Sequence, residues 1–167
     1  MTTALQLACD HPILMDAVRR SRKLLNRRAL VGAVAGAVPV PGLDWAVDAA
    51  LLSRMLPAIN AEFGLTPAQL DKLPAHTREQ VHKAIGTVGS VLIGKFVTRD
   101  LVLRMAKVAG KRLTIQQASK YVPIAGQAVS AMMSYAAIRY LGEEHIKDCV
   151  RVALQANLAL PAPHKVT

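Results

Sequence analysis

The chain has 167 residues, 52% of them hydrophobic and only 4% aromatic, and its 21 Lys and Arg against 11 Asp and Glu give a formal charge of +10. This length suits a single domain with its own core, and a composition rich in Ala, Leu and Val but poor in aromatics disfavours a β-sandwich. The two cysteines lack CxxC spacing, which disfavours a disulfide framework, and the N-terminus lacks the basic and long apolar regions of a secretory signal. We therefore expect a basic, all-α, cytoplasmic protein with acidic partners.

The first predicted helix begins at about Pro12, where Asp10 can act as the N-cap and proline suits the first turn. Apolar residues recur at helical spacing from there to about Val38. The sequence "PVPG" ends this helix, because Pro39 and Pro41 have no backbone donor and restrict the residues before them.

A second helix is predicted from about Gly42 to Glu62, with a kink at Pro57. Asp44 and Asp48 lie in its first two turns, where they complement the helix dipole, and this explanation is favoured over a catalytic pair of carboxylates. Trp45, the only tryptophan, lies beside them. Packing in the core is favoured for Trp45 over anchoring at a lipid interface.

Further helices follow from local start and stop signals. Gly64 ends one helix, and Thr66 with Gln69 forms a capping-box pattern that opens a short helix to about Pro74. By the same reasoning we expect helices over about 75–98, 99–109, 114–120, 124–140 and, after Gly142, to about Leu158. The sequence thus predicts a compact bundle of six to eight helices with Gly/Ala-rich hydrophobic helices, formed by residues 1–160 as one domain, with 161–167 as a flexible tail.

Three apolar stretches, at 29–43, 84–98 and 121–138, could enter a membrane or form a core. A spanning helix needs about twenty apolar residues. The first stretch has fifteen and is broken by prolines, the second contains Lys95, and the third has Pro123 and Gly126 near its start. The sequence therefore favours a helical core, which either has no membrane role or lies on or opens into a membrane. A stable integral protein is the less favoured alternative.

Basic residues gather in two clusters, one before the first apolar stretch and one after the second. A polybasic segment beside apolar residues is typical of attraction to anionic lipid, although a solvated helix face is the alternative. We predict that the following cations bind an anionic surface: Arg19, Arg20, Arg22, Lys23, Arg27, Arg28, Arg104, Lys107 and Lys111. The predicted apolar insertion or partner surface consists of Pro39, Pro41, Trp45, Pro123 and Gly126.

Two segments together resemble a known family of helical domains. These are "GAVPVPGLDWAVDAALLSRMLPAINAEFGL" and, some sixty residues later, "YVPIAGQAVSAMMSYAAIRYLGEEHIKDCVRVA". They resemble the helical domain of EcsC-like and YcjF-like bacterial proteins, through a Pro-Gly-Asp helix start and a later Pro-x-x-Gly helix that ends near Arg-Tyr. The matching residues are Pro41, Gly42, Asp44, Arg54, Phe63, Gly64, Pro123, Gly126, Arg139 and Tyr140.

This resemblance covers about residues 28–155 and implies an α-helical module found in membrane-associated proteins. Similar helices occur in immunity-related GTPases. The chain has no GxxxxGK[ST] phosphate loop, so the resemblance implies no GTP hydrolysis here. It also implies no catalytic residues, and it favours a role near a membrane or on a protein partner.

The sequence contains no catalytic pattern such as GxSxG, HExxH or GxGxxG. His145 and Cys149 are four residues apart and share a helix face, but a tetrahedral metal site needs further ligands and a nucleophile needs an oriented base. His76 and His82 are expected on the surface. We therefore expect no enzyme activity, no metal site and no cofactor.

These observations favour a non-catalytic module that acts as an adaptor or regulator at or near a membrane, peripheral to the inner membrane if the protein is bacterial. The alternative is a soluble protein, such as a chaperone or inhibitor, that binds an acidic or hydrophobic protein partner, and homo-oligomer formation stays open. Non-specific nucleic-acid binding is a second alternative, disfavoured because aromatics are not interleaved with the basic residues.

Overall fold

A computed structural model describes residues 3–36, 43–89 and 123–161, and this part of the chain is helical with no strand, which confirms the all-α prediction. Its helices are α1 (Ala4–Leu7), α2 (Pro12–Gly36), α3 (Leu43–Glu62), α4 (Pro67–Leu70), α5 (Ala75–Val88) and α7 (Pro123–Gln155). The predicted starts at Pro12 and at about Gly42 agree with α2 and α3 to within one residue.

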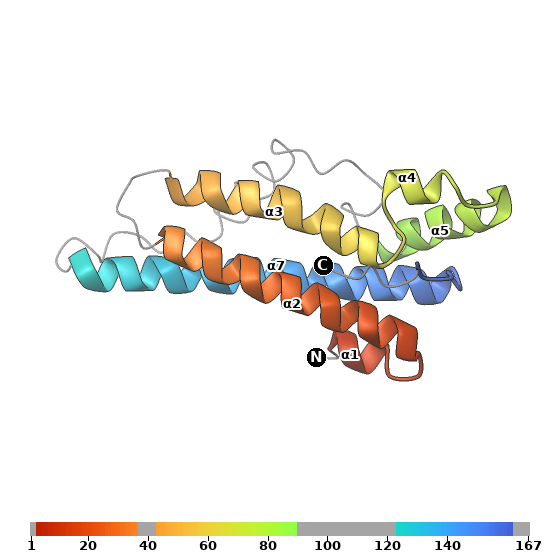
Figure 1. The fold of residues 1–167 in the computed structure, drawn as a ribbon, viewed down its shortest axis with the longest axis horizontal. Helices are drawn as coiled ribbons and strands as arrows, with labels where there is room; N and C mark the ends of the chain where they lie inside the picture. Colours follow the sequence, from red (N-terminus) through yellow and green to blue (C-terminus); the bar gives the residue numbers. More distant parts are fainter. Residues whose placement is uncertain (1–2, 37–42, 90–122, 162–167) are drawn as a thin grey trace.

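Three long helices, α2, α3 and α7, lie side by side and form the body of the described structure (Figure 1). The direction of the chain reverses from α2 to α3, and α7 runs antiparallel to α2 (Figure 1). The short helix α1 contacts α2 and α7, and α5 contacts α7. The termini of the long helices therefore meet at two ends of the body, and α4 and α5 lie at only one of them.

The core lies where the three long helices face one another. Its largest fully buried side chains come from all three and from the turn after α3, and they include Val18, Leu25, Met55, Ile59, Phe63, Leu65, Ile138, Ile146 and Val150. On α2 the buried positions Leu14, Ala17, Val18, Leu25 and Ala29 keep a helical period, as expected for an apolar stripe that faces the core. Burial of these side chains is the main force that holds the helices together.

Local signals explain several helix ends. Thr66 caps α4 through its side chain, and Gln69 bonds back to the Thr66 N–H, which confirms the predicted capping box. Gly64 adopts φ 70°, the left-handed conformation that favours glycine after a helix. A second capping box, Thr3 with Gln6, opens α1. The sequence reasoning missed α1, although its T-x-x-Q pattern is the same signal.

The prediction that one helix extends from about Ala75 to Thr98 is wrong. Helix α5 ends at Val88, because Gly89 adopts φ 71° and its N–H bonds to the Ile85 carbonyl at 3.0 Å. A left-handed glycine of this kind closes a helix by satisfying a free carbonyl.

The prediction of a break at Gly142 is also wrong, since α7 is continuous from Pro123 to Gln155. A Cβ at position 142 would lie 2.9 Å from Leu25 Cδ2 and closer still to Cδ1. The absence of a side chain at Gly142 therefore allows α2 and α7 to approach closely, and does not end a helix. The end of α7 agrees with the predicted region, because Asn157 is left-handed and the Leu158 N–H bonds to the Ala153 carbonyl at 3.0 Å.

Candidate functional site

Five of the six cations predicted on the first helix divide into two groups on α2. Arg20 Nε lies 2.7 Å from a Glu62 carboxylate oxygen of α3, and Arg22 Nε lies 3.0 Å from a Glu143 oxygen of α7, with a second contact in the same pair. These four side chains are only 21–27% exposed. Arg20 and Arg22 therefore tie α2 to its neighbours, and their charges are matched inside the bundle.

Arg19, Lys23 and Arg27 form the exposed group. They are four residues apart in turn, so they lie on one stripe along α2. Arg19 has a carboxylate partner, Asp16, at 3.3 Å, in a pair of which both members are more than half exposed. Such a pair contributes little energy and leaves the cation accessible. Arg28, the sixth predicted cation of this cluster, is partly buried.

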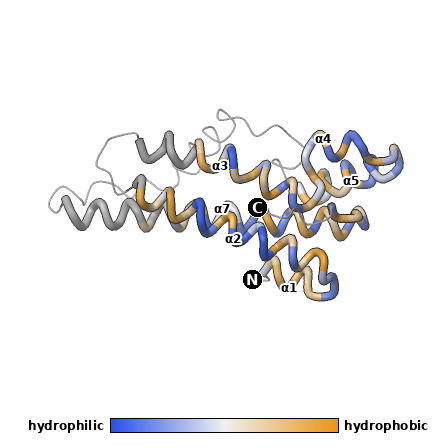
Figure 2. Tube along the Cα trace, in the orientation of Figure 1, coloured by the Kyte–Doolittle hydropathy of each residue, from blue (hydrophilic) through white to orange (hydrophobic). Residues whose placement is uncertain are grey.

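The same stripe of α2 becomes apolar toward the C-terminal end of the helix. Leu30, Val31 and Val34 follow Arg27 at spacings of three, four and seven residues, and they are 62%, 53% and 65% exposed. Figure 2 shows this change along α2, from hydrophilic in the middle to hydrophobic near its end. Three exposed branched apolar side chains that neighbour one another on one stripe are unusual for a solvated helix face.

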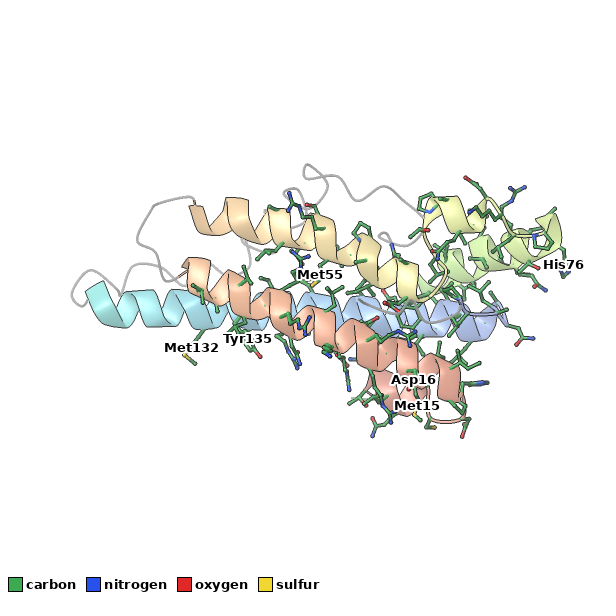
Figure 3. All side chains as sticks on the ribbon, in the orientation of Figure 1. Met15, Asp16, Met55, His76, Met132 and Tyr135 are labelled. Carbon is green, nitrogen blue, oxygen red and sulfur yellow. The ribbon has the colours of Figure 1, made fainter. Side chains whose placement is uncertain are left out.

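Helix α7 adds exposed apolar and aromatic side chains beside them. Met132, Tyr135 and Tyr140 are 72%, 39% and 64% exposed. Met132 and Tyr135 project from the same side of the body (Figure 3), and together with Ala33 and Ala136 they line a shallow apolar hollow of about 330 Å³ between α2 and α7. We call the set Arg19, Lys23, Arg27, Leu30, Val31, Val34, Met132 and Tyr135 the α2/α7 outer face.

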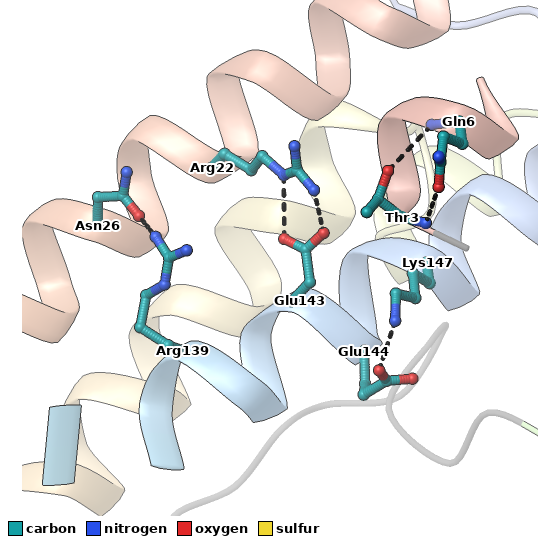
Figure 4. Close-up of polar contacts among 8 residues, drawn as sticks. All are labelled: Thr3, Gln6, Arg22, Asn26, Arg139, Glu143, Glu144 and Lys147. Carbon is teal, nitrogen blue, oxygen red and sulfur yellow. Dashed lines mark hydrogen bonds and ion pairs between the residues drawn. The ribbon is translucent and has the colours of Figure 1, made fainter. Parts of the chain in front are cut away.

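Polar contacts fix how α2 and α7 lie relative to each other. The Arg139 guanidinium donates to the Asn26 side-chain oxygen, and Arg22 pairs with Glu143 (Figure 4). Asn26 lies four residues after Arg22 on α2, and its partner Arg139 lies four residues before Glu143 on α7. The two contacts therefore define an antiparallel register. Asn26 and Arg139 consequently mark the same level on both helices. On one side of that level lie the exposed residues Leu30, Val31, Val34, Met132 and Tyr135, and on the other side lie the exposed residues Ile13, Tyr140 and Leu141.

Glu143 joins three elements through its carboxylate. Burial alone would raise the pKa of Glu143, but the hydrogen bond and charge of Arg22, the backbone N–H of Ala4 and the charge of Lys147 lower it below its usual value. Lys147 itself lies 2.6 Å from a Glu144 oxygen (Figure 4). Glu143 is therefore ionised at neutral pH and holds α1 and α2 against α7.

His145 and Cys149 share a helix face, as predicted, and they meet Asn60 of α3 in the core. His145 Nε2 donates to the Asn60 side-chain oxygen at 2.8 Å, and Cys149 Sγ lies 3.5 Å from the same oxygen. Burial lowers the pKa of His145 to about 4 and raises the pKa of Cys149. Both groups are neutral at pH 7, so this cluster is a polar contact between α3 and α7 rather than an activated nucleophile.

No group of three metal-ligating side chains occurs in the described ranges 3–36, 43–89 and 123–161. His76 and His82 are exposed, as predicted. Within the same ranges, no helix combines the length and the apolar character that crossing a membrane requires.

Several predicted site residues fall outside what the structure describes. Pro39, Pro41, Arg104, Lys107 and Lys111 lie outside the described residues, together with the helices predicted over 99–109 and 114–120. Trp45 belongs to α3 and Gly126 belongs to α7, but the surroundings of these two residues lie outside what the structure describes. Pro123 is the first residue of α7, in agreement with a helix start there.

The sequence reasoning did not single out the apolar half of the α2/α7 outer face. In the sequence the stretch at 29–43 forms one apolar block, because residues on every side of that helix are apolar. The spacing of Leu30, Val31 and Val34 after Arg27 was a signal that could have placed them on the stripe of Arg19 and Lys23. Their exposure is visible only once α3 and α7 are in place.

The chain is similar to a mammalian GTPase over most of its own length. Interferon-inducible GTPase 5 of Bos taurus is 31% identical over 157 residues, which cover 86% of this chain and 33% of the relative. The protein of the same name from Rattus norvegicus is 30% identical over 157 residues, with the same coverage. This similarity is consistent with the resemblance to the helices of immunity-related GTPases.

The chain spans about a third of the length of the curated relatives it matches. No protein-family model matches it, and no solved structure matches it significantly. The class that the fold defines is an all-α bundle, and its similarity is to a part of these larger relatives.

Proposed function

We propose that this chain is a non-catalytic helical module that docks on an anionic membrane surface through the α2/α7 outer face and acts there as an adaptor or regulator. The observation that carries the proposal is the continuity of exposed cations with exposed apolar side chains on one stripe of α2. Surface-bound amphipathic helices combine these two features, because cations attract anionic lipid and apolar side chains enter the headgroup boundary.

Electrostatic attraction is the first part of the docking. Each Lys or Arg near an anionic membrane contributes about 1 kcal/mol. Arg19, Lys23 and Arg27 can contribute in this way because they are exposed, whereas Arg20 and Arg22 already have carboxylate partners inside the bundle. The net charge of +10 adds a general attraction to the same surface.

The resemblance to EcsC-like and YcjF-like domains supports a place near a membrane, on its cytoplasmic side. The similarity to interferon-inducible GTPase 5 supports a module that works together with a larger protein. A soluble module that binds a protein partner through the same exposed apolar side chains is the second candidate. It predicts no affinity for lipid.

Co-sedimentation with vesicles tests the proposal. The full chain is mixed with phosphatidylcholine vesicles or with vesicles that also contain phosphatidylglycerol, at low and high salt. We expect binding to the anionic vesicles and a weaker bound fraction at high salt, because salt screens exposed charges. Absence of binding to both kinds of vesicle would overturn the proposal in favour of the protein partner.

A pair of charge reversals with equal net charge locates the surface. The variant Lys23→Glu with Arg27→Glu changes the α2/α7 outer face, and Lys72→Glu with Lys83→Glu changes two exposed cations around α4 and α5. We expect the first pair to weaken binding by about tenfold or more and the second pair to weaken it much less. Equal losses would show that net charge alone drives adsorption and would contradict this choice of surface.

A further inference from the structure

We propose that the docked bundle enters the membrane with one end first, so that the apolar ends of α2 and α7 reach the edge of the hydrocarbon and Arg27, Arg139 and Tyr140 lie at the headgroups. This inference rests on the proposed function and specifies how the α2/α7 outer face meets the lipid. The partner is the acyl-chain region of an anionic leaflet as well as its charged surface.

The polarity of the α2/α7 outer face changes along the helix axis. Arg19, Lys23 and Arg27 precede Leu30, Val31 and Val34 on the same stripe of α2. A helix that lies flat in an interface separates its polar and apolar residues around its circumference. Flat docking would place Arg19 and Val34 at the same depth, in environments that cannot suit both. An inclined α2 places the cations at the headgroups and places Leu30, Val31 and Val34 nearer the acyl chains.

Helix α7 has exposed side chains on the same side of the Asn26–Arg139 contact as Leu30, Val31 and Val34 of α2. Met132 and Tyr135 lie on that side of the contact, while the mostly buried Glu143, the buried Lys147 and Leu141, which is 39% exposed, lie on the other side. Two helices that run in opposite directions therefore both place exposed apolar side chains at the same end of the body. Tyr140 is 64% exposed and stands one residue from Arg139 in sequence. Tyrosine and arginine are residue types that commonly lie at the membrane–water boundary.

The exposed apolar part of α2 has a length that suits a shallow insertion. Seven residues separate Arg27 from Val34, which is about 10 Å of helix at 1.5 Å per residue. Amphipathic elements at interfaces bury their apolar side chains by about 5–10 Å. The described helices do not have the character of membrane spans. Helix α7 continues from Arg139 to Pro123, about 24 Å of helix at 1.5 Å per residue, so insertion into the outer part of one leaflet requires the bundle to be inclined and not upright.

The cations beside the apolar end favour lipid over a second copy of this chain. Arg139 donates to the neutral Asn26 side chain, and Lys23 and Arg27 are exposed next to it. A symmetric contact through this face would bring two such sets of positive charge together, and like charges across an interface are costly. An anionic leaflet offers the opposite charge at the required level.

Depth-dependent quenching tests the orientation. Single cysteines replace Val34, Met132 or Ile13 in a Cys9→Ser background, where Cys149 stays buried, and each is labelled with an environment-sensitive fluorophore. Ile13 is the matched control, because it is 65% exposed like Val34 but lies about 31 Å away along α2. The labelled full chains are bound to phosphatidylglycerol-containing vesicles that carry acyl-chain quenchers.

We expect the labels at positions 34 and 132 to be quenched and blue-shifted, and the label at position 13 to stay unquenched. Equal quenching at all three positions would show flat docking and overturn the orientation. Co-sedimentation without quenching at any position would show adsorption on headgroups only, which overturns insertion but leaves the proposed function intact. A chain that does not sediment with the vesicles would overturn both proposals.

An unlabelled pair of variants gives an independent result. Val34→Asp should reduce the bound fraction that survives high salt by about tenfold or more, because a carboxylate is costly among acyl chains. Ile13→Asp should leave that fraction unchanged. Circular dichroism of both variants checks that the helices are retained. Equal effects of the two substitutions would contradict the end-first orientation.

Discussion

Gly142 of α7 packs directly against Leu25 of α2, so closely that a methyl group at position 142 would lie 2.9 Å from Leu25 Cδ2 and nearer to Cδ1. Leu25 is fully buried and has little room to move. This contact sets the distance between the two helices that form the α2/α7 outer face. A residue that the sequence suggested as a helix end therefore determines how two helices pack.

Gly142→Ala should lower the free energy of unfolding by about 1–3 kcal/mol. The destabilisation from overpacking the core should exceed the stabilisation from the higher helix propensity of alanine. In a Leu25→Ala background the same change should instead stabilise by about 1 kcal/mol, since the obstructing side chain is gone. Urea unfolding of the four proteins measures both effects. Gly86→Ala, whose Cβ would meet no atom within 4 Å, is the control and should stabilise slightly. Destabilisation by Gly142→Ala in both backgrounds would contradict the Leu25 contact as its cause.

His145 should make the protein less stable in mild acid. Its folded pKa of about 4 lies below the usual 6.5, so the unfolded chain binds the proton first as the pH falls. The contribution of His145 to the free energy of unfolding should be fully present above about pH 6.5. It should decrease by about 3 kcal/mol as the pH falls to about 4 and stay constant below that. His145→Gln should flatten the decline between pH 6.5 and 5 in urea titrations, whereas His82→Gln should leave it unchanged. An unaltered slope in His145→Gln would show that other groups cause the decline.

Two of the ion pairs of α2, Arg22–Glu143 and Arg19–Asp16, should differ in their contributions to stability. Arg22→Gln should lower the free energy of unfolding by about 1–3 kcal/mol, because it leaves the half-buried Glu143 carboxylate without its cation. Arg19→Gln should cost less than about 1 kcal/mol, since its pair with Asp16 is exposed. Because the pKa of Glu143 is lowered, the Arg22 effect should diminish as the pH falls below the usual carboxyl range. Equal losses for the two variants would contradict the described packing of Arg22 on α7.

Ser21→Ala should keep or raise the stability of the fold by up to about 1 kcal/mol. The Ser21 hydroxyl is fully buried and has no hydrogen-bond partner, so its removal deletes a desolvated polar group. Thermal unfolding followed by circular dichroism measures the change. Ser53→Ala, which removes a hydroxyl that donates to the Ala50 carbonyl at 2.9 Å, provides the comparison and should not stabilise. A clear loss of stability in Ser21→Ala would show that this hydroxyl has a partner.

The two cysteines should differ in reactivity toward a thiol reagent at pH 8. Cys9 is exposed and should react at once. Cys149 is buried and its pKa is raised, so it should react only after unfolding. One equivalent of reagent is expected to be consumed by the native protein and two by the protein in guanidinium chloride. Fast reaction of both thiols in the native protein would contradict the buried contact of Cys149 with Asn60 and His145.

The sequence by itself determined the helical class and several of the local boundaries. Pro12, Gly64 and the Thr66–Gln69 pair mark helix ends through backbone chemistry that involves only their neighbours in the chain, so they could be interpreted without a fold. The same kind of signal was present at Thr3 and Gln6, where α1 went unpredicted.

Only the tertiary structure decided which cations are available and what Gly142 does. Arg19 and Arg20 are adjacent and chemically identical, but Glu62 lies 42 residues from Arg20 in sequence and Glu143 lies 121 residues from Arg22. Gly142 and Leu25, which are in contact, are similarly far apart in sequence. Local pattern cannot reveal such partners, because exposure and close packing depend on which distant helices the hydrophobic effect brings together. The α2/α7 outer face is a product of that assembly.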